Sequence, residues 1–220
     1  MMPRQPEPEY MDLDHEAEAY ALADFAEVNE AFLGRLLELA GGRPKAMAVD
    51  LGTGPGDIPW RVLRHRPRWH IVGADASLAM LRLAVKAFRR HGLRCHWVQC
   101  DAKGLPLASR AFDIVFSNSI LHHLAEVGPF WTEVKRIGKP GAAVFLRDLA
   151  RPEDETVARA LVEQYAGNES ETLKEEFHRS LLSAYTIDEV RAQLAEAGLD
   201  NLETVMSSDR HLDVFGHLPE

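Results

Sequence analysis

The chain has 220 residues, of which 46% are hydrophobic and 27% are charged, and its net charge at pH 7 is −9. This composition is typical of one globular domain, and no apolar run approaches the roughly 20 residues that cross a bilayer. Because the N-terminal residues lack an apolar signal core, a cytoplasmic location is expected. Cys95 and Cys100 are expected to be buried free thiols, neither a disulfide nor a metal-ligand set.

The N-terminal part is acidic and is predicted to be largely helical. Residues 1–9 are rich in Pro and Glu and are expected to form a disordered tail. Residues 10–42 are expected to form a helical arm of two helices, broken near residues 24–29 and ended by Gly41-Gly42. Residues 1–40 hold ten acidic residues against two arginines.

A basic stretch follows, because residues 61–94 carry nine basic residues against one aspartate. Such a patch can mark a nucleic-acid-binding protein. However, Leu78, Leu81 and Phe88 belong to one helical stripe, which leaves the basic side chains on the solvated faces of that helix. We therefore favour an ordinary surface, which the acidic segment could offset. A nucleic-acid acceptor stays open as an alternative, and no membrane association is expected.

From residue 43 onward, short apolar runs alternate with amphipathic runs. This alternation predicts parallel strands joined by crossover helices. The fold class is therefore α/β, a Rossmann-like, doubly wound and mostly parallel sheet. Strands are expected at residues 46–50, 69–74, 94–100, 112–118 and 142–148, with helices at residues 57–65, 77–91 and 129–137 and a turn at residues 139–141.

The alternation of strands and helices ends after residue 148. A helical insertion at residues 151–185 is expected to hold two helices, at about 153–165 and 171–184. Thr186 and Glu189 form a capping box for a helix at residues 187–197, because their spacing lets each side chain bond the other's backbone. Two short strands then close the chain as an antiparallel hairpin, since the link between them is too short for a crossover. These strands are expected at residues 202–207 and 211–216, and the main domain at residues 43–220.

The stretch AVDLGTGPGDIP at residues 48–59 places three glycines between a strand and a helix. Glycines allow tight turns and bring backbone N–H groups against a ligand. In open α/β sheets, ligands bind where parallel strands have their carboxyl ends. Four acids and one amide occupy the predicted strand ends, namely Asp50, Asp75, Asp101, Asn118 and Asp148.

Asp75 lies 23 residues after Gly52, where a carboxylate can accept hydrogen bonds from both ribose hydroxyls. This position suits a nicotinamide dinucleotide and S-adenosylmethionine equally. Asp50 directly before the loop suits an ammonium or sulfonium ligand better than a pyrophosphate. The spacing G-x-G-x-G also differs from the dinucleotide pattern G-x-G-x-x-G, so an amino-acid tail is favoured.

These residues resemble the class I S-adenosylmethionine-dependent methyltransferases. The resemblance covers residues 46–150 closely, and the final hairpin fits the family's reversed last strand. Its motifs are VDLGTGPG, GADASLAML, QCDAKGLPL, FDIVFSNSILHHL and KPGAAVFLRDL.

The resemblance implies the cofactor S-adenosyl-L-methionine, the product S-adenosyl-L-homocysteine and a set of binding residues. The glycines would pack against the methionine portion and Asp50 would help to hold its amino group. Asp75 would bind the ribose, Asp101 would accept from the adenine amino group, and Met80 would pack on the adenine. The cofactor-binding residues so implied are Asp50, Gly52, Thr53, Gly54, Gly56, Asp75, Ala76, Met80, Asp101, Ala102, Ser117 and Asn118.

The reaction expected is methyl transfer by in-line displacement to an unidentified small molecule. His122 and His123 are candidates for a general base, and no metal ion is expected. The sequence SNSI at residues 117–120 departs from the motif of adenine-N6 methyltransferases. Substrate walls are expected from the arm and the insertion; the side chains considered are Tyr20, Phe25, Arg147, Tyr165, Phe177, His178, Tyr185 and Arg210.

We further expect the arm and the insertion to act as a lid, so that deletion of residues 1–40 impairs transfer more than cofactor binding. Two alternatives stay open from the sequence. One is an oxidoreductase that uses NAD(P). The other is a protein that binds S-adenosylmethionine and transfers another group or none.

Overall fold

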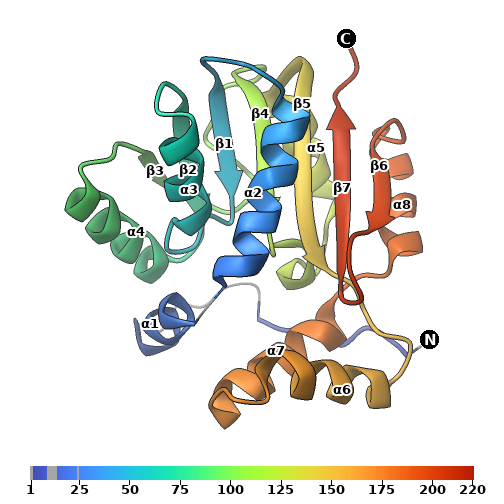
Figure 1. The fold of residues 1–220 in the computed structure, drawn as a ribbon. Helices are drawn as coiled ribbons and strands as arrows, with labels where there is room; N and C mark the ends of the chain where they lie inside the picture. Colours follow the sequence, from blue (N-terminus) through green and yellow to red (C-terminus); the bar gives the residue numbers. More distant parts are fainter. Residues whose placement is uncertain (1, 9–13, 24) are drawn as a thin grey trace.

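A seven-stranded sheet in the order β3-β2-β1-β4-β5-β7-β6 forms the centre of the molecule in the computed structural model (Figure 1). The structure describes residues 2–8, 14–23 and 25–220. Neighbouring strands pair in parallel from β3 to β5, whereas β7 is antiparallel to β5 and β6. The predicted Rossmann-like, mostly parallel sheet with an antiparallel C-terminal hairpin is therefore confirmed.

The elements follow the predicted alternation, and apart from β5 their ends from residue 43 onward lie within two residues of the expected ones. The strands are β1 (Met47–Leu51), β2 (His70–Asp75), β3 (His96–Gln99), β4 (Phe112–Asn118), β5 (Gly138–Leu149), β6 (Glu203–Met206) and β7 (His211–His217). The helices are α1 (Asp14–Leu22), α2 (Ala26–Ala40), α3 (Asp57–His65), α4 (Leu78–His91), η1 (Leu121–His123), α5 (Gly128–Ile137), α6 (Glu155–Ala166), α7 (Glu171–Ser183) and α8 (Ile187–Glu196).

Side-chain caps fix two helix starts, and the sequence predicted the second of them. Ser77 precedes α4 and its hydroxyl accepts from the Met80 N–H. Thr186 and Glu189 form the expected capping box at the start of α8. Each side chain satisfies an N–H that the first helical turn leaves without an intrahelical partner.

Strand β5 is longer than predicted, and this is a correction. The expected turn at residues 139–141 lies inside the strand, which begins at Gly138 beside Phe112. The pairing then shifts, because Ala143 is the next partner, opposite Ile114. The extra residues are accommodated by Gly141, whose φ of 68° lies in the left-handed region that glycine adopts without steric cost. The turn is therefore an irregularity within the strand.

Helices cover both faces of the sheet. One face packs against α2, α3 and α4, and the other against α5 and α8. Successive residues of β4 supply the two cores, since Ile114 and Phe116 belong to the first and Val115 to the second. This alternation follows from the two-residue period of a strand, and it explains why the strands read as continuous apolar runs.

Helix α2 belongs to the main core, although its sequence position placed it in the arm. Phe32, Leu33 and Leu36 are buried and pack with residues of α3 and the sheet. Their spacing puts them on one helical stripe. Deletion of residues 1–40 would expose this core face. That deletion therefore cannot separate a lid function from loss of stability. A test of the lid requires substitutions outside α2.

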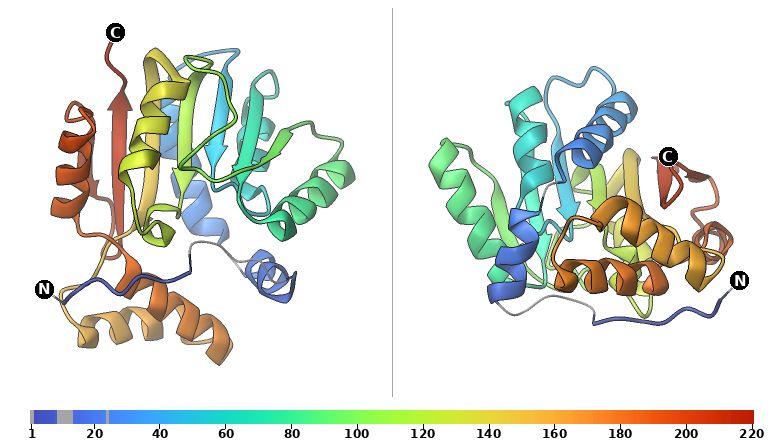
Figure 2. Two further views of the ribbon diagram at one scale, coloured as in Figure 1. Left: turned by 180° about the vertical axis from the view of Figure 1, so that it is seen from behind. Right: turned by 60° about the horizontal axis from the view of Figure 1, so that its bottom comes forward.

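The insertion and the N-terminal residues lie at the edge of the sheet where the parallel strands end (Figures 1 and 2). Helices α6 and α7 pack against each other below β5. The composition predicts disorder for residues 1–9, but residues 2–8 run along the insertion in the structure. The Met2 N–H donates to the Glu153 carbonyl and the Gln5 N–H to the Leu182 carbonyl.

Arg4 explains why this segment is held. Its guanidinium donates to the carbonyl groups of His122, Leu124 and Ser183, and it stacks 4.0 Å above the Tyr185 ring. Charged hydrogen bonds and a cation–π contact together offset the entropy lost on ordering a short segment. A prediction from composition does not take into account the contacts of a single residue such as Arg4.

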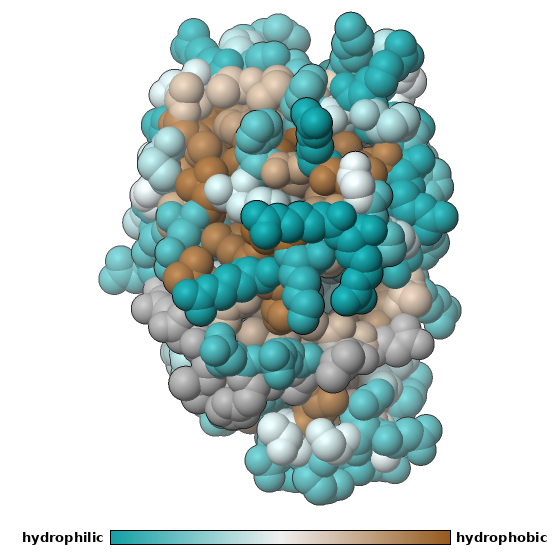
Figure 3. Space-filling model, turned by 90° about the vertical axis from the view of Figure 1, so that its left-hand side faces the viewer, coloured by the Kyte–Doolittle hydropathy of each residue, from teal (hydrophilic) through white to brown (hydrophobic). Residues whose placement is uncertain are grey.

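The basic stretch forms an ordinary helix surface. Figure 3 shows the α4 edge of the molecule, where hydrophilic and hydrophobic side chains are mixed. Arg61 pairs with Glu30 of α2 and with Asp57, so the acidic N-terminal region offsets part of the basic charge. Among the described residues, no helix combines the length and apolar composition that crossing a bilayer requires.

Candidate functional site

A cavity of about 800 Å³ lies where the parallel strands end. Its walls come from the glycine loop, the ends of β2 and β4, α1, η1 and the insertion. The sequence-predicted residues that line it are Tyr20, Phe25, Gly52, Gly54, Asp75, Ala76, Met80, Asp101, Ala102, Asn118, His122, His123, Arg147, Tyr165, Phe177 and Arg210. The structure therefore brings together residues that are up to 190 positions apart in the chain.

The glycine loop presents its backbone to this cavity. Gly52 and Gly54 line it, with φ angles of 69° and 52°. A Cβ added at Gly54 would meet no atom within 4 Å, so the space beside this residue is open for a ligand. A Cβ at Gly52 would instead lie 2.9 Å from Ile120. The first glycine thus permits close packing and the second permits close approach of a ligand.

Four of the predicted cofactor residues support the loop from behind and are not among the lining residues of the cavity. Gly56 packs beneath Trp97 and Phe88. Thr53 donates its hydroxyl to Asp50 at 2.8 Å. Ser117 donates to the Leu51 carbonyl at 2.5 Å. The structure assigns these residues to the position of the loop, where sequence reasoning expected contact with the cofactor.

Asp50 is 1% exposed. Its Oδ1 atom has no hydrogen-bond partner among the described residues. Burial raises the pKa of this carboxyl well above its usual range, although the Thr53 hydroxyl opposes the shift. A buried carboxyl with a free oxygen directly under the loop fits a cationic group above it, because such a group would relieve the desolvation penalty.

Asp75 ends β2 and faces the cavity. Its carboxylate accepts from the Gly54 N–H at 2.7 Å and from the Ser77 N–H at 2.8 Å. Burial raises the pKa of Asp75, and these backbone donors oppose the shift. A carboxylate has about four acceptor sites, so Asp75 keeps acceptor capacity for a ligand hydroxyl. Asp101 is exposed at the rim and accepts from the Lys103 N–H.

Sequence reasoning missed Asn29 and Ser119. Asn29 is a buried polar residue of α2 that lines the cavity and connects Asn118 with Asp57 through two hydrogen bonds. Asn29 lies four residues before Leu33 on the apolar stripe of α2, and this polar residue in an apolar stripe was the only sequence signal for its role. Ser119 lines the cavity with a φ of 62°. A positive φ in a residue other than glycine is uncommon and often marks a functional site, but sequence alone does not reveal it.

Aromatic side chains line the cavity from two sides. The Tyr20 and Phe25 rings, from the N-terminal part, lie 5.1 Å apart. Tyr165 and Phe177 come from the insertion, and the Arg210 guanidinium lies 3.3 Å above the Tyr165 ring. This arrangement gives the cavity apolar walls beyond the part next to the glycine loop, as a site for an organic acceptor requires.

Three predicted substrate residues have other partners. Arg147 lines the cavity but makes a bidentate ion pair with Asp213 at 2.6 and 2.7 Å. Tyr185 is not a lining residue and donates its hydroxyl to the Leu124 carbonyl. His178, also outside the lining, lies 3.1 Å from a Glu155 oxygen. The Arg147 guanidinium is therefore paired within the protein, although it lines the cavity.

His122 and His123 occupy η1 beside the cavity, at the end of β4 and β5. His122 is buried, and its Nδ1 donates to Asp148 at 2.5 Å. Burial opposes the charged form of His122, but Asp148 and Glu7 outweigh it and raise its pKa. Burial, then the neighbouring His122, lowers the pKa of His123 to about 3. The pKa of His122 therefore lies above the usual histidine value, and that of His123 lies below it.

The cysteines are free, as predicted, but only partly buried. Burial raises the pKa of Cys95 to about 12 and that of Cys100 to about 11. Both are therefore thiols at neutral pH, which excludes them as nucleophiles there.

Comparison with known proteins agrees with this geometry. Residues 49–146 match the family described as "Methyltransferase domain". These residues form a class I S-adenosylmethionine-dependent methyltransferase domain. S-adenosylmethionine is the methyl donor of this family, and the match favours it over the nicotinamide-dependent alternative. The matched segment runs from β1 to β5 and contains the glycine loop, Asp75 and Asp101.

Two curated relatives show the range of the family. The chain is 34% identical over 113 residues to the ubiquinone/menaquinone biosynthesis C-methyltransferase UbiE of Desulfotalea psychrophila (strain LSv54 / DSM 12343), covering 51% of this chain and 45% of that protein. It is 37% identical over 91 residues to the malonyl-[acyl-carrier protein] O-methyltransferase of Legionella pneumophila, covering 40% and 31%. The match thus spans less than half of each relative.

Solved structures share the fold over nearly the whole chain. A SAM-dependent methyltransferase from Aquifex aeolicus superposes with a TM-score of 0.71 at 18% identity, covering 94% of this chain and all of that one. The phosphoethanolamine N-methyltransferase 2 of Haemonchus contortus, in complex with S-adenosyl-L-methionine, gives 0.73 at 16% identity, covering 94% and 58%. At this identity the likeness concerns the fold alone.

Proposed function

We propose that this protein transfers the methyl group of S-adenosylmethionine to a small organic molecule held in the 800 Å³ cavity. The observation that carries the proposal is the continuity of this cavity. One part is lined by the glycine loop, Asp75 and Asp101, and the other by Tyr165 and Phe177 of the insertion. Cofactor and acceptor would therefore meet within one continuous cavity.

The chain's own residues would bind and orient the cofactor. When bound, S-adenosylmethionine supplies an electrophilic methyl group on a sulfonium. Gly54 offers open backbone next to its methionine portion, and the buried Asp50 carboxyl beneath the loop would pair with the cofactor's amino group. Asp75 keeps acceptor positions for the ribose. Catalysis would then rest mainly on holding the nucleophile in line with the methyl and the sulfur.

The acceptor atom is not set by this scaffold, since the relatives named above are C-, O- and N-methyltransferases. The two histidines suit the role of general base poorly. His123 has a pKa of about 3, far below the operating pH that favours proton transfer. His122 lies between the carboxylates of Asp148 and Glu7, which stabilise its protonated form.

The test is a pair of measurements on the full chain. Calorimetric titration with S-adenosylmethionine, S-adenosylhomocysteine and NADH should show binding of the first two and not of the third. Incubation with methyl-labelled cofactor and a panel of quinones, carboxylic acids and amines should then label one class. Binding of NADH alone would refute the proposal. Binding of the cofactor with another group transferred would support the alternative that the sequence left open.

A further inference from the structure

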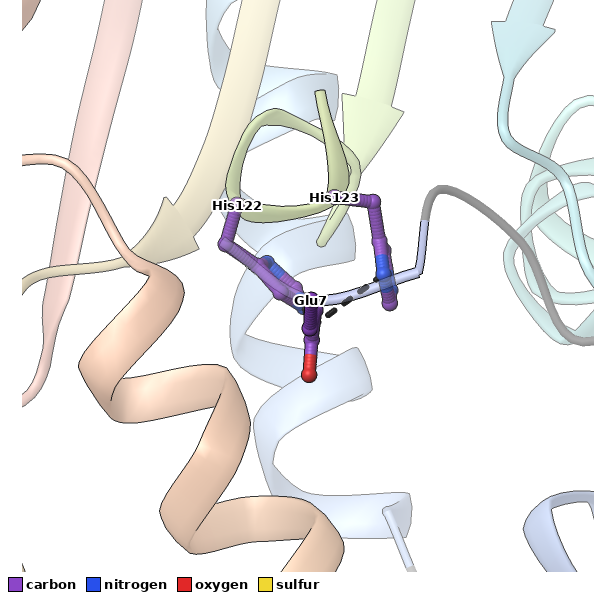
Figure 4. Close-up of side chains that lie close together, drawn as sticks. All are labelled: Glu7, His122 and His123. Carbon is purple, nitrogen blue, oxygen red and sulfur yellow. Dashed lines mark ion pairs between the residues drawn. The ribbon is translucent and has the colours of Figure 1, made fainter. Parts of the chain in front are cut away.

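Glu7, His122 and His123 form a cluster beside the cavity that the proposed transfer does not use (Figure 4). Glu7 comes from the N-terminal segment, 115 residues before His122. One ligand atom from each residue lies within 4.8 Å of the others. His122 is buried and the other two side chains are partly buried, with 10%, 5% and 20% of their surfaces exposed for Glu7, His122 and His123. Solvent therefore does not explain why they gather.

The two distances from Glu7 to the histidines are close to those between neighbouring ligand atoms of a metal site. Oε1 of Glu7 lies 3.5 Å from Nε2 of His122 and 3.2 Å from Nδ1 of His123. In a tetrahedral zinc site with bonds of about 2.0–2.1 Å, neighbouring ligand atoms are about 3.3–3.4 Å apart. Two imidazole nitrogens and one carboxylate oxygen are a known ligand set for zinc. A single cation could thus bind between these three atoms with small side-chain movements.

The surrounding hydrogen bonds are also those of a ligand set. His122 uses Nδ1 to donate to Asp148 at 2.5 Å, which leaves Nε2 directed at Glu7. Ser180 donates its hydroxyl to the Glu7 carboxylate at 3.1 Å. Metal-bound histidines commonly donate their other N–H to a carboxylate, and metal-bound carboxylates are themselves hydrogen-bonded. The Pro8 carbonyl lies 3.3 Å from the same Nδ1 atom of His123, so a cation bound at Nδ1 would replace this contact and move the proton to Nε2.

We propose that Glu7, His122 and His123 bind one divalent cation of the zinc class, through Oε1, Nε2 and Nδ1 respectively. No metal ion was expected from the sequence, in which Glu7 lies 115 residues before His122. Since both histidines line the cavity, a cation with three protein ligands keeps its fourth position directed there. Open positions of this kind characterise catalytic zinc sites.

The role of the cation rests on the proposed function, although its binding does not. At the open position it would hold an oxygen or nitrogen of the acceptor and lower the pKa of that group. Since both histidines would be bound to the cation, the cation itself would supply the activation of the acceptor. The acceptor would then be a small molecule with a metal-binding heteroatom next to, or at, the methylated position.

The experiment titrates Zn²⁺ into the full, untagged, chelator-stripped protein by calorimetry, without S-adenosylmethionine. We expect one equivalent to bind. Glu7→Ala and His123→Ala, which change partly exposed or terminal positions, should each weaken binding more than about 100-fold, because removing a ligand exceeds the roughly 10–100-fold cost of removing an outer partner. His178→Ala is the matched control, since His178 faces a single carboxylate from Glu155, and it should bind Zn²⁺ like the wild type.

A second readout uses Co²⁺, whose visible absorption reports a tetrahedral site. The band should appear in the wild type and the His178→Ala variant and be lost in Glu7→Ala and His123→Ala, with circular dichroism confirming that each is folded. The proposal is overturned if the wild type takes up no Zn²⁺ or if both ligand variants bind it equally well. Titration of the same samples with S-adenosylmethionine tests the proposed function separately, so the two failures are distinguishable.

Discussion

The Gly54 N–H donates a 2.7 Å hydrogen bond to the carboxylate of Asp75, which ties the glycine loop to the end of β2. The residues are 21 positions apart, and each would contact a different part of S-adenosylmethionine. The bond fixes the spacing of the two contacts before a ligand arrives, so that less entropy is lost on binding.

Asp75→Ala should weaken binding of S-adenosylmethionine by roughly 1–3 kcal/mol, because charged hydrogen bonds to the ribose would be lost. Calorimetric titration measures this change. Asp113→Asn is the control, since Asp113 pairs with Lys139 and is not a lining residue of the cavity. An Asp75→Ala variant that binds with wild-type affinity would place the ribose elsewhere.

Two glycines of the same loop should respond differently to alanine. At Gly56 the new Cβ would lie 2.9 Å from Trp97 and 3.2 Å from Ala84, in addition to a φ of 84°. At Gly54 it would enter open space, with backbone strain of roughly 1–2 kcal/mol. Urea denaturation should therefore show a larger loss of stability for Gly56→Ala than for Gly54→Ala. Calorimetric titration should show that Gly54→Ala loses more cofactor affinity relative to its loss of stability than Gly56→Ala does. The reverse order would contradict the assignment of Gly56 to packing.

The buried ion pair between Arg147 and Asp213 should stabilise the fold. Both side chains are buried, and Ser207 also donates to Asp213. Arg147→Met leaves the Asp213 charge uncompensated, so it should destabilise the fold by about 3–5 kcal/mol. The double variant Arg147→Met with Asp213→Asn should recover much of the loss. Thermal unfolding of the three proteins measures it, and equal losses in the single and double variants would refute this account.

His211 should make the fold less stable in acid. Burial, followed by Arg210 and Arg147, lowers its pKa from 6.5 to about 4. As the pH falls below 6.5, the unfolded chain takes up a proton before the folded one, so stability falls until about pH 4. The full difference corresponds to about 3 kcal/mol.

His211→Gln should therefore flatten the dependence of unfolding free energy on pH between 6.5 and 4. His122 also has a shifted pKa, but it is present in both proteins. Its contribution therefore cancels, and the difference between the two curves reports His211. Parallel curves for the two proteins would show that His211 does not contribute.

Phe177 should affect the acceptor more than the cofactor. It lines the cavity from α7 and packs beside Leu161 and Leu181, whereas the glycine loop lies on another wall. Once an acceptor is known, Phe177→Ala should raise its KM several-fold and leave the affinity for S-adenosylmethionine nearly unchanged. Equal losses in both would remove the insertion from the acceptor site.

The sequence by itself determined the α/β alternation, the helix caps and the side of the cavity that the glycine loop and Asp75 form. These depend on local rules: apolar periodicity, the capping box at Thr186 and Glu189, and the fact that parallel strands end at one edge. Because the glycine loop and Asp75 lie within one strand–helix–strand unit, their proximity follows from chain order.

Tertiary packing alone decided the rest. Arg147 is occupied by Asp213, Asn29 reaches Asn118 from α2, and α2 itself is part of the core. Glu7 meets His122 and His123 because Arg4 anchors the N-terminal segment against backbone carbonyls of η1. These contacts join segments with no periodic relation in sequence. Their partners are set by which surfaces remain to be buried once the sheet has formed, and no local pattern records that choice.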